Sequence, residues 1–260
     1  DWHNPYDIEG MESVVSQLEQ AVKDHKRILV FGDFDLDGIS ATTIMARGLR
    51  EVGGDVVPFI PLRFEEGYGL TEAAIARALT YEPDVVITVD NGISAKEEAH
   101  FLTDAGVSLI VTDHHEPSGL VPQNVALVDP KCSDSPSSIL AGAGVSLKVI
   151  QALCSRFGMP HFWRELIDFA TLGTVADLMP MVGENRALVS EGIKIINDNP
   201  RACLAALLNE SGFGDTTLSS SNLSFTIVPR LNAAGRMGNA QLALDLLMCD
   251  DFLEASTLAR

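Results

Sequence analysis

The sequence has few cysteines and no long apolar segment. Its four cysteines, Cys132, Cys154, Cys203 and Cys249, have neither the CxxC spacing nor the Cys/His spacing of a zinc site. We therefore expect free thiols, as in a reducing cytoplasm, rather than disulfides. No apolar run approaches the roughly 18 to 20 residues that span a bilayer, and no signal-peptide pattern opens the sequence. These absences predict a cytoplasmic protein without a membrane segment.

Basic residues are also scarce. The 260 residues include 18 Lys and Arg against 36 Asp and Glu, a formal net charge of −18. This balance speaks against a nucleic-acid partner, because such proteins usually present a basic surface. However, a site for divalent cations needs carboxylates and carries positive charge once it is filled. The sequence begins at Asp1 without Met and ends in a helix-like run at 241–260, so we expect it to be part of a longer protein.

Alternating strand and helix patterns run from residue 27 to residue 130. Short β-branched segments predict strands at 27–31, 56–60, 85–89, 108–112 and 125–128. Amphipathic segments predict helices at 10–24, 40–52, 71–80 and 95–105. This alternation predicts an α/β fold with a mostly parallel sheet that is covered by helices on both faces.

The strand pattern fades after Pro136. The remaining periodicity predicts helices at 143–157, 162–175, 184–197 and 201–210, followed by a flexible loop at 211–221. We therefore predict three parts. These are an α/β core at 1–135, a helical remainder at 136–210, and a loop with the start of a linker helix at 211–260.

Acidic and imidazole side chains follow three of the predicted strands. They lie in Gly-Asp-Phe-Asp-Leu-Asp-Gly at 32–38, Asp-Asn-Gly at 90–92 and Asp-His-His at 113–115. The carboxyl ends of parallel strands meet at one edge of a sheet. A helix N-cap would explain Asp90 or Asp113 alone, but not the whole group. Clustered carboxylates repel one another without a cation, and oxygen with imidazole ligands suits Mn²⁺ or Mg²⁺. The sequence therefore predicts a metal site.

A calcium-binding EF-hand loop is the alternative interpretation of Asp33, Asp35 and Asp37. Such a loop needs a bidentate Glu at position twelve, where this sequence has Ile44, and it follows a helix rather than a strand. The EF-hand interpretation is therefore rejected.

Asp177 ends a helix-like run, where its charge opposes the helix dipole unless a cation lies nearby.

Seven motifs, in order along the chain, resemble the DHH phosphoesterase superfamily, and within it the RecJ family of single-strand-specific DNA exonucleases. They are GDFDLDG (32–38), RFEEGYGL (63–70), ITVDNGIS (87–94), VTDHH (111–115), LAGAGV (140–145), GTVADLMP (173–180) and PRLNAAGR (229–236). The resemblance implies a Mn²⁺- or Mg²⁺-dependent hydrolase that digests single-stranded DNA from the 5′ end in DNA repair and recombination. It also implies a monomer, with single-strand-binding protein or helicase partners.

The same resemblance implies a site with two divalent cations. It assigns metal ligation to Asp33, Asp35, Asp37, Asp90, His114 and Asp177, with Asp90 bridging both ions. It implies that Asp113 orients the site and that His115 faces the substrate phosphate, so Asp90, Asp113 and His115 are the expected catalytic residues. Several superfamily members have a His where this sequence has Phe31, so we expect either that the first ion is held more weakly or that Asp33 compensates.

The likeness also implies nucleic-acid contacts in the small-residue motifs. Arg63 and Arg230 match phosphate-binding positions, and Asn232 and Arg236 are further candidates, although a solvated surface Arg is the ordinary alternative. Tyr68 is expected either to stack on a base or simply to be a half-buried turn residue. A basic groove on an acidic surface is therefore expected.

Two other functions stay open. One is a phosphoesterase of short oligonucleotides, cyclic dinucleotides or pyrophosphate, and the other is a non-catalytic scaffold that keeps the fold. RecJ-type proteins continue into a second catalytic domain, DHHA1, that does not appear in this sequence. We therefore expect intact metal binding with weak or absent processive cleavage.

Overall fold

A parallel β-sheet lies at the centre of the first half of the chain. The computed structural model describes residues 2–260, so the predicted domain 1–135 is described from its second residue onward. Within these residues the sheet has the strand order β2-β1-β3-β4-β5, and each neighbouring pair is parallel. The strands are β1 (Arg27–Phe31), β2 (Asp55–Phe59), β3 (Val85–Thr88), β4 (Ser108–Thr112) and β5 (Ala126–Val128). All five predicted strands are confirmed to within one residue.

Helices cover both faces of the sheet because alternate strand residues face two different cores. In β1, Ile28 and Val30 belong to the larger core, whereas Leu29 and Phe31 belong to the smaller one. The larger core includes α1 (Met11–Lys23), α2 (Leu36–Glu51) and α5 (Gly142–Arg156), and the smaller one includes α3 (Glu72–Leu79) and α4 (Ala99–Asp104). The predicted α/β fold with flanking helices is therefore confirmed.

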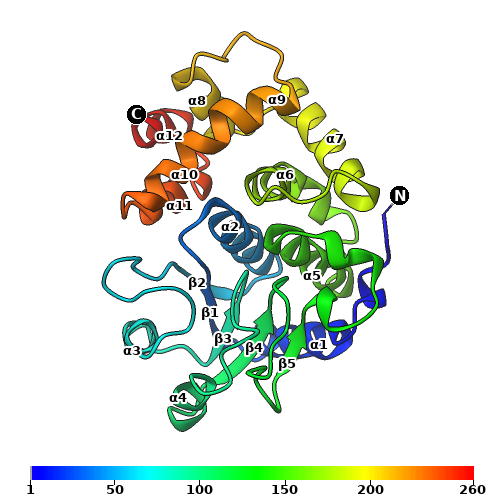
Figure 1. Cartoon of the computed structure of the whole chain (residues 1–260), viewed down its shortest axis with the longest axis vertical. Coiled ribbons are helices and arrows are strands. Elements are labelled where there is room, and N and C mark those ends of the chain that lie inside the picture. The colour runs from blue at the N-terminus through cyan, green and yellow to red at the C-terminus, as the bar shows by residue number, and fades with distance from the viewer. Residues whose placement is uncertain (1) are drawn as a thin grey trace.

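The second half of the chain adds helices on the far side of α2 and α5 from the sheet (Figure 1). Its helices are α6 (Ile167–Ala176), α7 (Gly183–Asp198), α8 (Ala202–Glu210), α9 (Ser220–Asn222), α10 (Val228–Arg236), α11 (Ala240–Leu247) and α12 (Phe252–Ala259). A π-helical turn, η5 (Leu223–Ile227), precedes α10, and short 3₁₀ turns lie at η1 (Pro5–Asp7), η2 (Pro130–Cys132), η3 (Pro136–Ile139) and η4 (Phe162–Leu166). The larger core runs across residues 135 and 210, and the division of the chain there stays a prediction.

Two helices begin at aspartate caps that the apolar periodicity does not reveal. Helix α2 begins four residues before the predicted start because the Asp35 side chain accepts the Gly38 N–H at 2.7 Å. The predicted run at 241–260 is divided into α11 and α12, and Asp251 caps α12 by accepting the Glu254 N–H. Within residues 2–260, no helix has both the length and the apolar character required to cross a bilayer.

Candidate metal centre

All six predicted metal ligands converge at the carboxyl edge of the sheet. Asp33 and Asp35 follow β1, Asp37 lies in the first turn of α2, and Asp90 follows β3. His114 follows β4, and Asp177 ends α6. Side-chain atoms lie within 4.8 Å of one another in three groups: Asp33, Asp35 and Asp90; Asp37, His114 and Asp177; and Asp90, His114 and His115. Asp90 therefore belongs both to the first group and to a group that contains His114.

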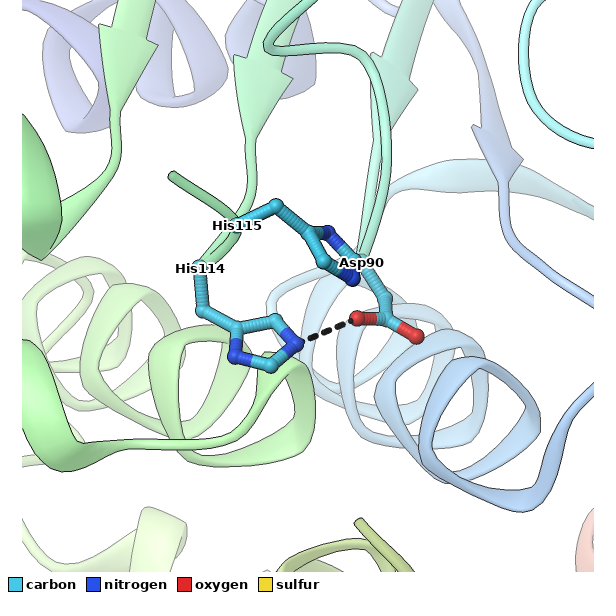
Figure 2. Close-up of side chains that lie close together, drawn as sticks. All are labelled: Asp90, His114 and His115. Carbon is cyan, nitrogen blue, oxygen red and sulfur yellow. Dashed lines mark ion pairs between the residues drawn. The ribbon is translucent and has the colours of Figure 1, made fainter. Parts of the chain in front are cut away.

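His114 lies at the centre of the carboxylates. Its Nε2 atom is 2.9 Å from Oδ1 of Asp90, 3.4 Å from Oδ2 of Asp37 and 3.5 Å from Oδ2 of Asp177. Figure 2 shows the imidazole edge directed at the Asp90 carboxylate. Burial, with a smaller contribution from the His115 charge, lowers the pKa of His114 to about 4, so the ring is neutral at pH 7.

Several buried atoms at this point have no hydrogen-bond partner. Among the described residues, these include Oδ1 of Asp90 and both ring nitrogens of His114. Buried polar atoms are nearly always hydrogen-bonded, so atoms left without a partner at this point indicate that a bound group completes the site. Carboxylate oxygen and neutral imidazole nitrogen are the donors that Mn²⁺ and related ions take. The residues therefore fit a divalent cation.

The carboxylates disfavour one another's ionisation. Burial raises the pKa values of Asp37 and Asp90 well above the usual range, and the charges of Asp35 on Asp37 and of Asp37 on Asp90 raise them further. Burial and the Asp35 charge also raise the pKa of Asp33 to about 8 and that of Asp177 to about 6. A cation among these groups would offset the repulsion and favour the ionised, ligating forms.

The loop after β3 has a constrained backbone that directs Asp90 into the group. Asp90 itself is in the left-handed region, at φ 59°, which non-glycine residues seldom adopt. The next residue, Asn91, holds this loop against the loop after β1, because its Nδ2 atom is 3.0 Å from the Gly32 carbonyl oxygen and 2.9 Å from that of Val89. Asn91 therefore fixes the distance between two ligand-bearing loops.

Asp113 and His115 form a pair beside the predicted ligands. Asp113 accepts the backbone N–H groups of Ile93 at 3.1 Å and of His114 at 2.8 Å, which fixes its carboxylate. Its Oδ1 atom also lies 2.6 Å from Nδ1 of His115. This hydrogen bond raises the pKa of His115 to about 9 despite partial burial. His115 is therefore a cation at neutral pH, and its side chain is 45% exposed.

Two of the predicted nucleic-acid residues lie beside the metal ligands. The Arg63 guanidinium lies over the rings of Phe34 and Phe64, 5.4 Å and 5.7 Å from their centroids. Arg63 also lines a cavity of about 390 Å³ between the loop after β2 and the end of α10. Tyr68 is 54% exposed, and its hydroxyl is 3.4 Å from the Asp90 carbonyl oxygen. Both side chains therefore lie close to loops that carry metal ligands.

The three candidates on α10 have different surroundings. Oδ1 of Asn232 accepts the backbone N–H of Leu36 at 3.0 Å, so this amide contacts the metal-binding loop itself. Arg230 instead donates to the carbonyl oxygens of Glu210 and Ala259, and it lines a separate cavity of about 150 Å³. Arg236 is exposed at the end of α10. The structure thus brings Asn232 to the metal centre and engages Arg230 with α8 and α12.

Sequence reasoning missed the groups that support the metal ligands. Phe34 and Phe64 hold Arg63, and the sequence offers one signal for them, an aromatic residue inside each of two motifs. The backbone N–H groups of Gly142 and Ala143 bind Asp37. In the sequence, the only indication of these two N–H groups is the small-residue motif LAGAGV, which begins a helix without a polar capping residue.

Comparison with known proteins identifies relatives across nearly the whole chain. Residues 27–174 match the DHH family, N-terminal domain. The single-stranded-DNA-specific exonuclease RecJ of Thermus thermophilus is 41% identical over 251 residues, which cover 96% of this chain and 37% of that protein. The RecJ of Dickeya dadantii is 38% identical over 265 residues, covering 96% of this chain and 46% of that protein. The chain thus spans less than half the length of these curated relatives.

A solved structure agrees with the sequence comparison. The crystal structure of exonuclease RecJ bound to manganese superposes with a TM-score of 0.89 at 40% sequence identity. The match covers 97% of this chain and 64% of that one.

Proposed function

The chain belongs to the DHH family, and we propose that it forms the metal-binding part of a RecJ-type exonuclease that hydrolyses single-stranded DNA from the 5′ end. The observation that carries this proposal is the convergence of five aspartates and His114 at one sheet edge. The RecJ relatives, which match nearly the whole chain, supply the substrate class. The activity is that of a phosphodiester hydrolase.

The proposed cofactors are two divalent cations, Mn²⁺ or Mg²⁺. Asp33, Asp35 and Asp90 would hold one cation, and Asp37, His114 and Asp177 would hold the other. Asp90 also groups with His114, so its carboxylate would be shared between the two. When bound, such a pair of cations lowers the pKa of the attacking water and neutralises charge on the phosphoryl oxygens. The buried acceptors without hydrogen-bond partners support this assignment.

His115 is proposed to act on the substrate phosphate. Because Asp113 keeps it protonated and occupies Nδ1, its other ring nitrogen is left to donate to a substrate. It can donate a hydrogen bond to a non-bridging phosphoryl oxygen or a proton to the departing 3′ oxygen. Asp113 supports the reaction by orienting this imidazolium.

Single-stranded DNA is proposed to lie along Arg63, Tyr68 and helix α10. Arg63 is held by two aromatic faces, which leaves its guanidinium N–H groups available for a phosphate. Tyr68 offers an exposed ring on which a base can stack. Nδ2 of Asn232 and the guanidinium of the exposed Arg236 are further hydrogen-bond donors for the DNA phosphates. Arg230 would contact DNA only after breaking its hydrogen bonds to the carbonyl oxygens of Glu210 and Ala259.

A cytoplasmic monomer is part of the same proposal. The four cysteines are free within the described residues, as expected for a reducing compartment. By family resemblance, single-strand-binding protein or a helicase would be its partners in DNA repair and recombination.

The proposal is tested by Mn²⁺ calorimetry together with digestion of a 5′-labelled single strand. We expect two-site Mn²⁺ binding in the wild type and loss of at least one site in Asp90→Ala, because Asp90 is shared. Asp104→Ala, which removes an exposed carboxylate on α4, is the matched control and should bind as the wild type. Wild-type protein that binds no Mn²⁺ would refute the metal centre. Digestion of dinucleotides but not of long strands would favour a small-substrate phosphoesterase instead.

A further inference from the structure

Helix α5 begins without a capping side chain of its own. Ala141 occupies the N-cap position, and its methyl side chain accepts no hydrogen bond. The first N–H groups of a helix have no partner within the helix and need an acceptor from elsewhere. Here the acceptor comes from a residue more than 100 positions earlier in the chain. Asp37 accepts the Gly142 N–H at Oδ2 and the Ala143 N–H at Oδ1, each at 2.9 Å.

This double contact fixes the plane of the Asp37 carboxylate. Each oxygen has two lone pairs, so each can accept an N–H and still offer a lone pair to a cation. The positive end of the α5 dipole also favours the ionised carboxylate, which burial alone disfavours. Asp37 is therefore held in the orientation that a ligand needs.

Two glycines allow helix backbones to touch the carboxylates directly. A Cβ atom at Gly142 would lie 2.6 Å from both Cβ and Oδ1 of Asp90. A Cβ atom at Gly173, in α6, would lie 2.8 Å from Oδ1 of Asp37 and 2.5 Å from Cβ of Ala143. These separations are far below van der Waals contact, so any side chain at either position must displace a ligand or a helix.

We propose that Gly142, Ala143 and Gly173 are positioning residues, which set the orientation of Asp37 and its separation from Asp90. The inference rests on the proposed metal-binding function and gives the LAGAGV motif a role in it. The N-terminus of α5 acts as a fixed support against which the aspartates from α2 and from the loop after β3 are held.

Thermal unfolding in EDTA tests the capping contact without any metal or activity. Asp37→Asn removes the charge but keeps one oxygen acceptor, whereas Asp37→Ala removes both acceptors. We expect Asp37→Ala to unfold about 2–4 °C below Asp37→Asn, the effect of one lost cap in a chain of this size. In the matched pair, Asp177→Ala and Asp177→Asn, no such gap is expected, because among the described residues no backbone N–H donates to the Asp177 side chain and its backbone, at φ −87°, accepts either residue. Equal gaps at the two positions would overturn the proposal.

Mn²⁺ calorimetry tests the glycine contact. Gly142→Ala should weaken Mn²⁺ binding by about 10- to 100-fold, the usual effect of disturbing groups that orient metal ligands. Gly144→Ala is the matched control in the same helix, because its Cβ would meet Leu140 rather than a carboxylate. If Gly142→Ala binds Mn²⁺ as tightly as the wild type does, the proposal is overturned. If that variant does not fold, the proposal is judged by the unfolding temperatures of Asp37→Ala and Asp37→Asn. Absence of Mn²⁺ binding in the wild type would instead count against the proposed function.

Discussion

Nδ1 of His115 lies 2.6 Å from Oδ1 of Asp113, and this contact sets the charge of the histidine. The carboxylate is itself held by backbone N–H groups, so it cannot turn away from the imidazole. The pair thus holds a fixed imidazolium beside the metal centre.

Replacing Asp113 by Asn should lower the pKa of His115 from about 9 toward the ordinary value of about 6.5. The amide keeps an oxygen for the N–H donors but loses the charge that stabilises the imidazolium. NMR titration of the imidazole protons measures the shift, and His161, which lies far along the chain, serves as the internal control. An unchanged His115 pKa would show that the carboxylate charge does not set the protonation of the ring.

Without divalent cations, stability should fall as the pH rises from about 6.5 to 8. Asp33 has a raised pKa, so the folded state binds more protons than the unfolded state between its unfolded value of 3.8 and about 8. His115 acts in the same direction between 6.5 and about 9. His114, whose pKa is lowered to about 4, opposes this trend only below about pH 6.5. Thermal unfolding in EDTA across this range measures the slope.

Saturating Mn²⁺ should remove much of that slope and raise the melting temperature, because the cation binds the ionised, folded site. A Tm that rises from pH 6.5 to 8 in EDTA would contradict the carboxylate electrostatics described for this site.

Arg63→Ala should weaken single-strand binding and reduce its dependence on salt. Loss of one phosphate contact lowers the slope of log affinity against log salt by about 0.7 for a single strand. Lys194→Ala removes the same charge from an exposed position on α7 and should leave the slope unchanged. Fluorescence anisotropy over a salt series measures both, and equal slopes for the two variants would exclude a specific Arg63 contact.

Asn232 offers its amide oxygen to Leu36, so two variants separate its possible roles. Asn232→Ala leaves the Leu36 N–H without its acceptor and should lower Mn²⁺ affinity by about tenfold. Asn232→Asp keeps the acceptor and should retain Mn²⁺ binding, but it should weaken DNA binding because a carboxylate repels phosphate. If Asn232→Ala binds Mn²⁺ as well as the wild type does, the Leu36 contact has no effect on the metal centre.

The sheet and the aspartates at its edge were predictable because their signals are local. Each strand is a short β-branched run, and Asp90 and Asp113 follow such runs directly. The start of α2 was misplaced because a side-chain cap, Asp35, determines it rather than apolar periodicity.

The supporting contacts were not predictable because each depends on distant residues meeting in space. Asp37 with Gly142 and Leu36 with Asn232 join segments more than 100 residues apart, and no spacing rule connects them. At Arg230, the motif predicted a phosphate contact. It could not predict that the guanidinium donates to the carbonyl oxygens of Glu210 and Ala259 in the fold.

The left-handed backbone of Asp90 means that cation binding and thermal stability favour different residues at this position. Glycine would adopt this φ without the steric strain that a side chain carries, and it would also remove a buried carboxylate from a repelling cluster. An Asp90→Gly protein should therefore be more thermostable than the parent in EDTA while losing its shared ligand. Thermal stability alone would therefore favour glycine at position 90, whereas cation binding requires the aspartate.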